Sequence, residues 1–271
     1  MGIKRQISST SSLGAGQFAF AADMPAKAPA YSAPVVASHN WSGCYAGVNA
    51  GGTWAKSDGT CSGITESSTA FAVGAATVVP NAANSSIHGS GFIGGGQIGC
   101  NYQAGAWVLG GEADFQYTGL DTTRTAVSAT LTTIVPGNIS ESFSSHWLST
   151  IRGRLGYASG AWLLYGTGGL AIANVSYSDQ ICFPTAAIPI CNTASSSSTR
   201  AGWTAGAGLE WMFTPKWSVK AEYLYVNLGS TTNNSVGVAT ATGAIPFPNG
   251  TIQHNRNLTE NIARLGVNYR F

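Results

Sequence analysis

Charged residues are scarce in this 271-residue chain, making up 9% of it, against about 25% in typical soluble domains. Long apolar runs are missing too, because no stretch reaches the roughly 18 consecutive apolar residues that a membrane-spanning helix needs. The longest runs, such as residues 161–165, have the length of a strand. The first absence disfavours an ordinary soluble enzyme, and the second disfavours a helical membrane protein. A β-barrel fits both, since its strands hide apolar residues in alternation.

The sequence patterns of metal sites and enzymes are also missing. The chain contains no Cys-x-x-Cys pair, no Cys/His spacing of a zinc site and no Gly-x-Ser-x-Gly nucleophile motif. A Gly-x-Gly-x-x-Gly spacing occurs at 89–94 and again at 94–99, but it leads into a tight turn rather than the helix of a dinucleotide site. We therefore expect no enzyme, no metal and no cofactor.

The first 22 residues have the pattern of a secretion signal. Lys4 and Arg5 precede a modest apolar stretch, and the small residues Ala21 and Ala22 precede Asp23 as at a signal-peptidase site. Residues 23–40 are rich in Pro and Ala and are expected to form a flexible periplasmic lead-in. Removing residues 1–22 leaves 11 basic and 11 acidic residues, so the net charge gives no reason to expect nucleic-acid binding.

From residue 41 onward, eight segments are expected to be strands: 41–55, 89–102, 106–118, 143–157, 161–177, 199–213, 217–229 and 258–271. Three connections are tight (103–105, 158–160 and 214–216) and four are long (56–88, 119–142, 178–198 and 230–257). Short turns alternate with long loops in outer-membrane barrels. The sequence therefore predicts an all-β fold, an eight-stranded antiparallel up-and-down transmembrane β-barrel over residues 41–271, in the bacterial outer membrane.

Aromatic and charged residues occupy opposite faces of these strands. Aromatics at strand ends form interfacial girdles, while charges point away from lipid, where an Arg or Lys at the midplane costs about 2–4 kcal/mol. Two interpretations of the lumen stay open. One is a salt-bridge network that fills it; the other is a narrow polar pore, with inner glycines such as Gly95, Gly99, Gly206 and Gly208 leaving gaps for water. The predicted lumen charges are Glu112, Asp114, Arg152, Arg154, Glu210, Lys220, Glu222, Arg264 and Arg270.

Five cysteines indicate an oxidising compartment. Cys44 lies near the start of the first strand and Cys100 near the end of the second, so an antiparallel pair brings them close. Cys182 and Cys191 lie in one predicted loop and could close it, which leaves Cys61 over.

Several segments, taken in order, resemble the small porin-like outer-membrane proteins of alphaproteobacteria, the opacity-type or porin-family surface antigens. They are 41–52, 91–99, 111–115, 152–157, 208–211, 220–225 and the closing 264–271. The resemblance implies an abundant outer-membrane barrel and carries over no catalytic residue. The chain departs from the family at Cys44 and Cys100, where aromatics are common. The terminal strand, with Tyr269 and Phe271, resembles the assembly signal of such barrels, which implies the barrel-assembly machinery as a partner, beside outer-membrane lipid and lipopolysaccharide.

Two functions remain as hypotheses. The first is a structural surface protein with weak porin activity for small solutes, in which inner arginines and carboxylates set the conductance. The second is adhesion or ligand binding, for example of haem or a host molecule, by loops 56–88 and 230–257. Those loops hold few charges, so a strongly electrostatic ligand is not expected.

Overall fold

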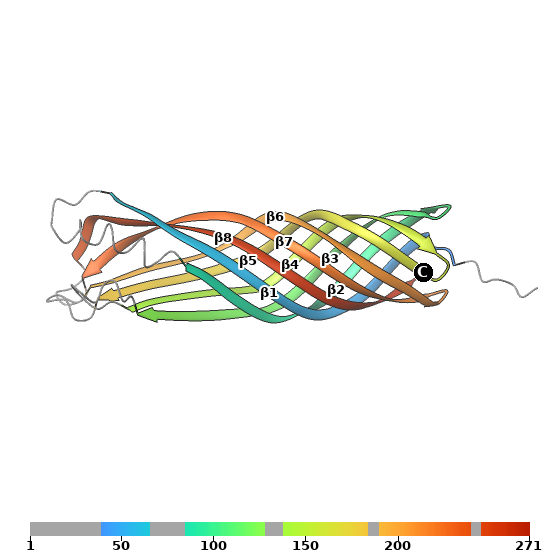
Figure 1. The fold of residues 1–271 in the computed structure, drawn as a ribbon, viewed down its shortest axis with the longest axis horizontal. Coiled ribbons are helices and arrows are strands. Elements are labelled where there is room, and N and C mark those ends of the chain that lie inside the picture. The colour runs from blue at the N-terminus through green and yellow to red at the C-terminus, as the bar shows by residue number, and fades with distance from the viewer. Residues whose placement is uncertain (1–38, 66–84, 128–137, 184–189, 240–244) are drawn as a thin grey trace, which may run out of the picture. The chain divides into compact units, whose positions relative to one another are not determined.

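The computed structural model describes residues 39–65, 85–127, 138–183, 190–239 and 245–271. Eight antiparallel strands form a closed barrel in which each strand pairs with the next in sequence and β1 pairs with β8 (Figure 1). The strands are β1 (Gly43–Thr65), β2 (Ser85–Ala104), β3 (Trp107–Val127), β4 (Asn138–Ser159), β5 (Trp162–Phe183), β6 (Ile190–Thr214), β7 (Trp217–Ala239) and β8 (Ile245–Arg270). The predicted fold class is confirmed.

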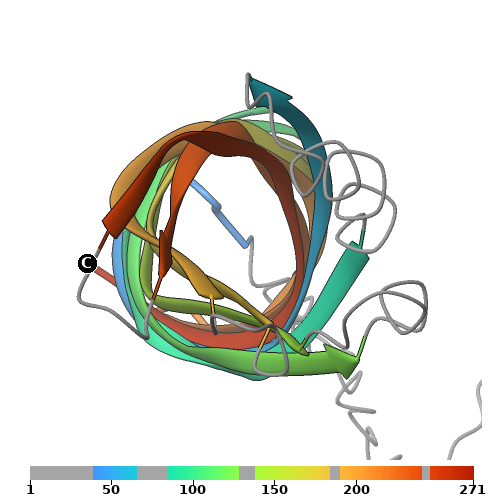
Figure 2. The same ribbon diagram turned by 90° about the vertical axis from the view of Figure 1, so that its left-hand side faces the viewer.

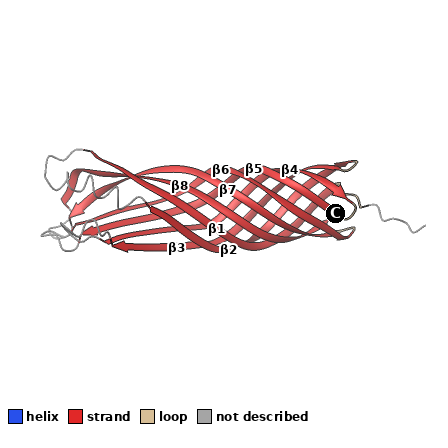
Figure 3. Ribbon diagram, viewed as in Figure 1, coloured by secondary structure: helices blue, strands red, loops and turns tan. Residues whose placement is uncertain are grey.

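Strands make up the regular structure of the described residues (Figure 3). None of these residues belongs to a helix long and apolar enough to cross a membrane. The predicted secretion signal, 1–22, and most of the predicted lead-in, 23–40, lie outside the described part of the chain.

Three two-residue turns close one end of the barrel, called here the turn end, where the barrel's last residue also lies (Figure 1). Gly105 and Gly160 take positive φ angles of 62° and 59° in two of them, a backbone region that glycine enters without steric cost. Each turn is followed at once by a tryptophan: Trp107, Trp162 and Trp217. The turns, 105–106, 160–161 and 215–216, overlap the predicted connections 103–105, 158–160 and 214–216 at their last residues, and they set an aromatic row at this end.

The strands run well past the predicted boundaries at the opposite end, the loop end. Residues 56–65, 119–127, 178–183 and 230–239, expected in loops, are strand. The expectation was wrong because these segments are rich in polar residues, so alternation gives little contrast to detect. Backbone pairing continues beyond the apolar belt because hydrogen bonds, rather than apolar contact, hold these residues.

The outward face of the barrel carries two rows of exposed aromatic residues. On β3, Trp107 and Tyr117 lie ten residues apart and are 59% and 59% exposed, a spacing that matches the roughly 9–11 residues a tilted strand needs to cross a bilayer. At the turn end, Trp162 stacks on Trp211 and Trp217 packs edge-on against Tyr269. Between the rows lie exposed apolar side chains such as Leu109 and Leu265, as in a lipid-facing belt.

The inward face is layered along the barrel. Starting from the turn end, the inward positions of β8 are buried and carry, in order, Arg270, Asn268, Gly266, Arg264, Ile262, Glu260, Leu258 and Arg256. The apolar side chains of Ile262 and Leu258 therefore lie between the charges near the turn end and Arg256 near the loop end, and Glu260 is buried between these two apolar residues, where it accepts from Thr53.

One aromatic residue lies on the face opposite to its prediction. Phe143 was expected to face lipid with Trp147, but it is buried at 2% exposure. The pairing of β4 with β5 shifts between Ser145 and Leu148. Such a bulge exchanges the two faces of the strand, so Phe143 packs against Tyr177 in the lumen.

Candidate functional site in the barrel lumen

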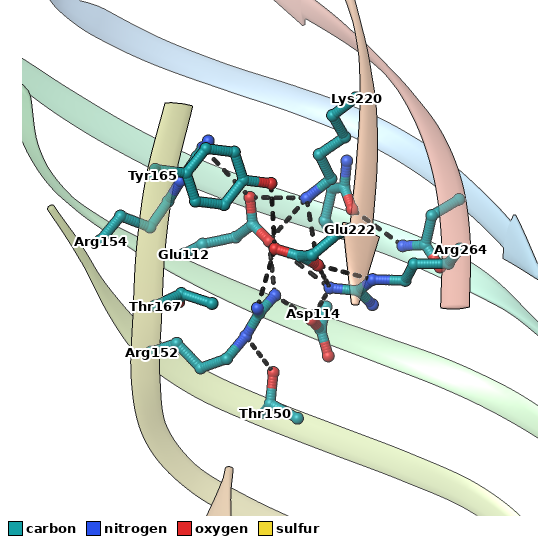
Figure 4. A network of polar contacts seen from close by, with 12 residues as sticks. Glu112, Asp114, Thr150, Arg152, Arg154, Tyr165, Thr167, Lys220, Glu222 and Arg264 are labelled. Atoms are coloured by element: carbon teal, nitrogen blue, oxygen red, sulfur yellow. Dashed lines mark hydrogen bonds and ion pairs between the residues drawn. The ribbon is translucent and has the colours of Figure 1, made fainter. Parts of the chain in front are cut away.

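Eight of the nine predicted lumen charges meet in one network near the turn end, and all of them except Glu210 are labelled in Figure 4. They come from five strands: Glu112 and Asp114 from β3, Arg152 and Arg154 from β4, Glu210 from β6, Lys220 and Glu222 from β7, and Arg264 from β8. The paired residues on β3, β4 and β7 sit two apart, because alternate side chains of a strand share a face. These eight residues form what is called the network.

The first half of the network is centred on Glu222. Its carboxylate receives Arg152 Nη1 at 3.0 Å and Arg264 Nε at 2.8 Å. Both guanidinium groups also reach Asp114, at 2.8 and 2.9 Å. Arg152 from β4 and Arg264 from β8 thus share two carboxylates, which gives each charge more than one charge-assisted hydrogen bond.

The second half is centred on Glu112. Lys220 Nζ lies 2.7 Å from Glu112 Oε1, and Arg152 Nη2 lies 2.6 Å from the same oxygen. Arg154 joins this half to Glu210, with Nη2 at 2.7 Å from Glu210 Oε2. Ser218 and Asn268 donate to the other oxygen of Glu210 at 2.6 and 2.9 Å. The hydrogen-bonding capacity of Glu210 is therefore met from two further strands.

Two buried tyrosines that the sequence reasoning missed complete the network. The Tyr45 hydroxyl donates to Glu112 Oε2 at 2.7 Å and accepts from Arg154. The Tyr165 hydroxyl donates to Glu222 at 3.0 Å, and its ring lies 3.8 Å from the Arg154 guanidinium carbon. Tyr45 stands opposite Gly99 in the register and Tyr165 opposite Gly208. The sequence signal that could have identified these tyrosines is the glycine at the position opposite each of them on the neighbouring strand.

The network is electrically balanced and buried. It contains four carboxylates and four cationic side chains, and each of the eight side chains is 0–2% exposed. A buried charge that loses its partner costs about 3–5 kcal/mol, which holds such a set together as a unit. Buried charges that are paired with one another can stabilise the barrel by filling its lumen.

Arg270, the ninth predicted lumen charge, lies apart from the network. Its guanidinium carbon is 5.0 Å from the centre of the Trp41 ring, and its Nη1 donates to the Asn40 carbonyl at 2.8 Å. The prediction that it shares the network is therefore wrong. Arg270 is the last residue of β8, so it reaches the mouth of the barrel and stacks there instead.

Two pairs of cysteines are partners across neighbouring strands. Cys44 and Cys100 are register partners joined by a disulfide. Cys182 and Cys191 are register partners on β5 and β6.

The Tyr269 and Phe271 rings are 6.1 Å apart on the outward face, and the Phe271 amide donates to the Cys44 carbonyl at 3.2 Å. The terminal strand thus forms the seam with β1.

Two further layers toward the loop end also escaped the sequence reasoning. The first is an apolar layer that includes Ile93, Leu148, Leu224, Val226 and Ile262, each fully buried. The second is an outer ion cluster in which Arg256 Nη2 contacts Glu141 at 2.7 Å and Asp179 at 2.9 Å. These three charges fell inside predicted loops, so their inward phase was not considered.

No group of three or more His, Cys, Asp and Glu side chains within the described ranges is arranged to hold a metal ion.

Comparisons with known proteins agree with this architecture. Residues 26–271 match the family model for the outer membrane protein beta-barrel domain. The 31 kDa outer-membrane immunogenic protein of Brucella melitensis is 32% identical over 258 residues, covering 93% of each chain. The 22 kDa outer membrane protein of Rhizobium leguminosarum is 34% identical over 145 residues, 53% of this chain and 56% of its own length. The solved structure of the outer membrane protease OmpT from Escherichia coli aligns with a TM-score of 0.45 at 12% identity, covering 84% of this chain and 97% of its own.

The family match and the alphaproteobacterial relatives confirm the resemblance drawn from the sequence, and with it the location in the outer membrane. The turn end is accordingly the periplasmic end and the loop end the extracellular end. The chain belongs to the outer membrane protein beta-barrel domain family.

Proposed function

We propose that the protein is a structural surface protein of the outer membrane whose lumen is sealed, and that it is neither a porin nor an enzyme. The observation that carries the proposal is the balanced network, with four acids, four bases and side chains at most 2% exposed. A conducting pore needs its charged lining in contact with water, since rings of charge select ions only where ions pass.

The other layers of the lumen support the same proposal. Two of the four inner glycines expected to leave gaps for water have a ring beside them, because the Tyr45 and Tyr165 rings occupy the space beside Gly99 and Gly208. Gly95 and Gly206 instead lie close to the backbone of the neighbouring strand. The apolar layer around Leu224 and Ile262 lies between the network and the extracellular end, and an ion crossing an apolar layer loses its hydration shell.

Liposome swelling tests this proposal. Vesicles holding the refolded protein are diluted into an isotonic solution of a small sugar such as arabinose, beside vesicles holding a known general porin. We expect the rate of swelling to equal that of protein-free vesicles. Uptake of arabinose at a rate that rises with the amount of folded protein would contradict a sealed lumen.

Ligand binding by the extracellular part is a second candidate, favoured by one feature. A recess of about 320 Å³ opens over β4, β5 and β6, lined mainly by serines: Ser142, Ser144, Ser176, Ser178, Ser195, Ser196 and Ser197. Ser176 donates to Ser197 at 2.9 Å. An uncharged, hydroxyl-rich surface suits neutral sugars better than a charged ligand such as haem.

Outer-membrane lipid against the apolar belt, and lipopolysaccharide sugars at the serine recess, are the partners that we propose. Glycan-array binding of the refolded protein, compared with a Ser176→Lys and Ser178→Lys double variant, tests the second. Equal binding by both proteins would rule the recess out.

A further inference from the structure

Trp41 lies inside the periplasmic mouth of the barrel, although the sequence predicted it as the first residue of a strand. The first strand begins at Gly43, and Trp41 is 0% exposed. Figure 2, which looks along the barrel, shows the start of the described chain, in blue, crossing the space within the ring of strands. The other tryptophans at this end, such as Trp107, Trp162 and Trp217, face outward and are exposed.

Side chains from four strands form a socket around the Trp41 ring. Its apolar walls are Val108, Leu163, Tyr165 and Met212, from β3, β5 and β6. The Arg270 guanidinium from β8 lies 5.0 Å from the ring centre. A cation placed over an indole face attracts it electrostatically. The socket therefore offers both apolar contact and a charge for the face of an aromatic ring.

Polar contacts fix the orientation of this residue. The indole Nε1 donates to the Gly160 carbonyl in the β4–β5 turn at 3.3 Å, and the Trp41 amide donates to Gln103 Oε1 beside the β2–β3 turn at 2.7 Å. Arg270 also holds the preceding residue through the Asn40 carbonyl at 2.8 Å. Trp41 thus contacts the β4–β5 turn through its indole and the end of β2 through its backbone amide, while Arg270 at the end of the closing strand holds Asn40.

Gly43 makes this inward turn of the chain possible. Its φ of 126° lies in a region that L side chains rarely adopt. Space is not the constraint there, because an added Cβ would meet no atom closer than 3.8 Å. Gly43 therefore acts through its backbone angle, which sets the bend between the segment in the mouth and the strand.

We propose that the periplasmic mouth is a binding socket for an indole ring, occupied by Trp41 of the same chain, and that Trp41 is a reversible plug swung in on the Gly43 hinge. The site takes a flat bicyclic aromatic with one N–H donor. Because the plug is carried by the segment that enters the barrel rather than by the barrel wall, it can leave while the strands stay paired.

Chemical rescue tests the socket. Trp41→Ala removes the plug, and buried cavities of this size bind matching aromatic molecules. We expect its urea midpoint in detergent to fall below that of the wild type, and added indole to restore at least half of the loss in a saturable manner. Trp107→Ala, which removes an exposed tryptophan at the same end, is the control and should not respond to indole. Equal responses of the two variants, or none, would overturn the proposal.

A second measurement does not depend on the alanine variant folding. The acrylamide quenching of Trp41 is obtained as the difference between the wild type and Trp41→Phe. We expect this component to be protected several-fold relative to free N-acetyltryptophanamide, and Gly43→Ala to abolish the protection while the barrel keeps its heat-modifiable mobility. Gly96→Ala, at an outward position of β2, is the matched control. A Trp41 component quenched as strongly as the free amide, or unchanged in Gly43→Ala, would show that no hinged plug exists.

Discussion

Tyr45 on β1 and Gly99 on β2 face each other inside the barrel, and the phenol ring fills the space that a side chain at position 99 would need. A Cβ built on Gly99 would lie 2.4 Å from the Tyr45 hydroxyl oxygen. Tyr165 and Gly208 repeat this relationship on β5 and β6, also at 2.4 Å. Gly99 and Gly208 therefore leave room for two tyrosines that hydrogen-bond carboxylates of the network.

The first prediction concerns these glycines. Gly99→Ala and Gly208→Ala should each lower the stability of the barrel by about 1–3 kcal/mol, because overpacking displaces a tyrosine that bonds a buried carboxylate. Gly96→Ala on the same strand is the control, since its Cβ would meet nothing closer than 3.8 Å. Urea unfolding in detergent, followed by fluorescence, measures all three. Equal midpoints for Gly99→Ala and Gly96→Ala would contradict the packing described.

The second prediction concerns the coupling of the network. Glu222→Leu leaves Arg152 and Arg264 without one shared carboxylate and should cost roughly 3–5 kcal/mol. Asp58→Asn breaks the exposed Lys56–Asp58 pair instead, which should cost at most about 1 kcal/mol. The comparison of their urea midpoints separates a dry network from a hydrated one. A wild-type midpoint for Glu222→Leu would mean that water reaches the arginines.

Much of this architecture can be predicted from the sequence because lipid imposes a strict contrast between faces. On β3, Tyr117 and Glu112 fall on opposite faces because one position is odd and the other even. The same alternation places the other members of the network on the inward face. Beyond the aromatic rows the contrast disappears, so Arg256 and Glu141 looked like loop residues. A bulge reversed Phe143, and alternation cannot indicate a bulge. Trp41 was placed in a strand because a local pattern does not report that the chain turns inward at Gly43.

The third prediction concerns the Cys44–Cys100 disulfide, whose cysteines are 56 residues apart in sequence. Closing a loop of this length constrains the unfolded chain by about 4 kcal/mol in the chain-entropy model. A Cys44→Ser and Cys100→Ser double variant should therefore unfold at lower urea than the oxidised wild type. Reducing the wild type should bring its midpoint to that of the variant. A reduced wild type that keeps the oxidised midpoint would contradict this role.

The fourth prediction is a second disulfide between Cys182 and Cys191. These residues are direct register partners on β5 and β6, and directly opposite positions of an antiparallel pair bring Cβ atoms close enough to bond. Peptide mapping under non-reducing conditions should find the 182–191 link beside the 44–100 link, with Cys61 free. A Cys61 cross-link to either residue would refute the assignment.

The fifth prediction concerns the end of the chain. Deleting Phe271 removes a residue that is 74% exposed and whose amide donates to the Cys44 carbonyl at the seam between β8 and β1. We expect the deletion to reduce membrane insertion strongly, through lost recognition by the barrel-assembly machinery. Phe213→Ala, which removes an exposed aromatic of β6, is the control. Normal amounts of the truncated protein in the outer membrane would contradict the assembly role.

Single-channel recording in a planar bilayer tests the sealed lumen most directly, because a single open path of ion size is visible as current. The refolded full-length protein, with folding verified by heat-modifiable mobility, is recorded beside Arg152→Ala and Glu222→Ala. The account predicts no steady openings of the wild-type barrel at any applied voltage that the bilayer tolerates. Steady wild-type openings whose size and ion preference change in Arg152→Ala and Glu222→Ala would show instead that the network lines a pore.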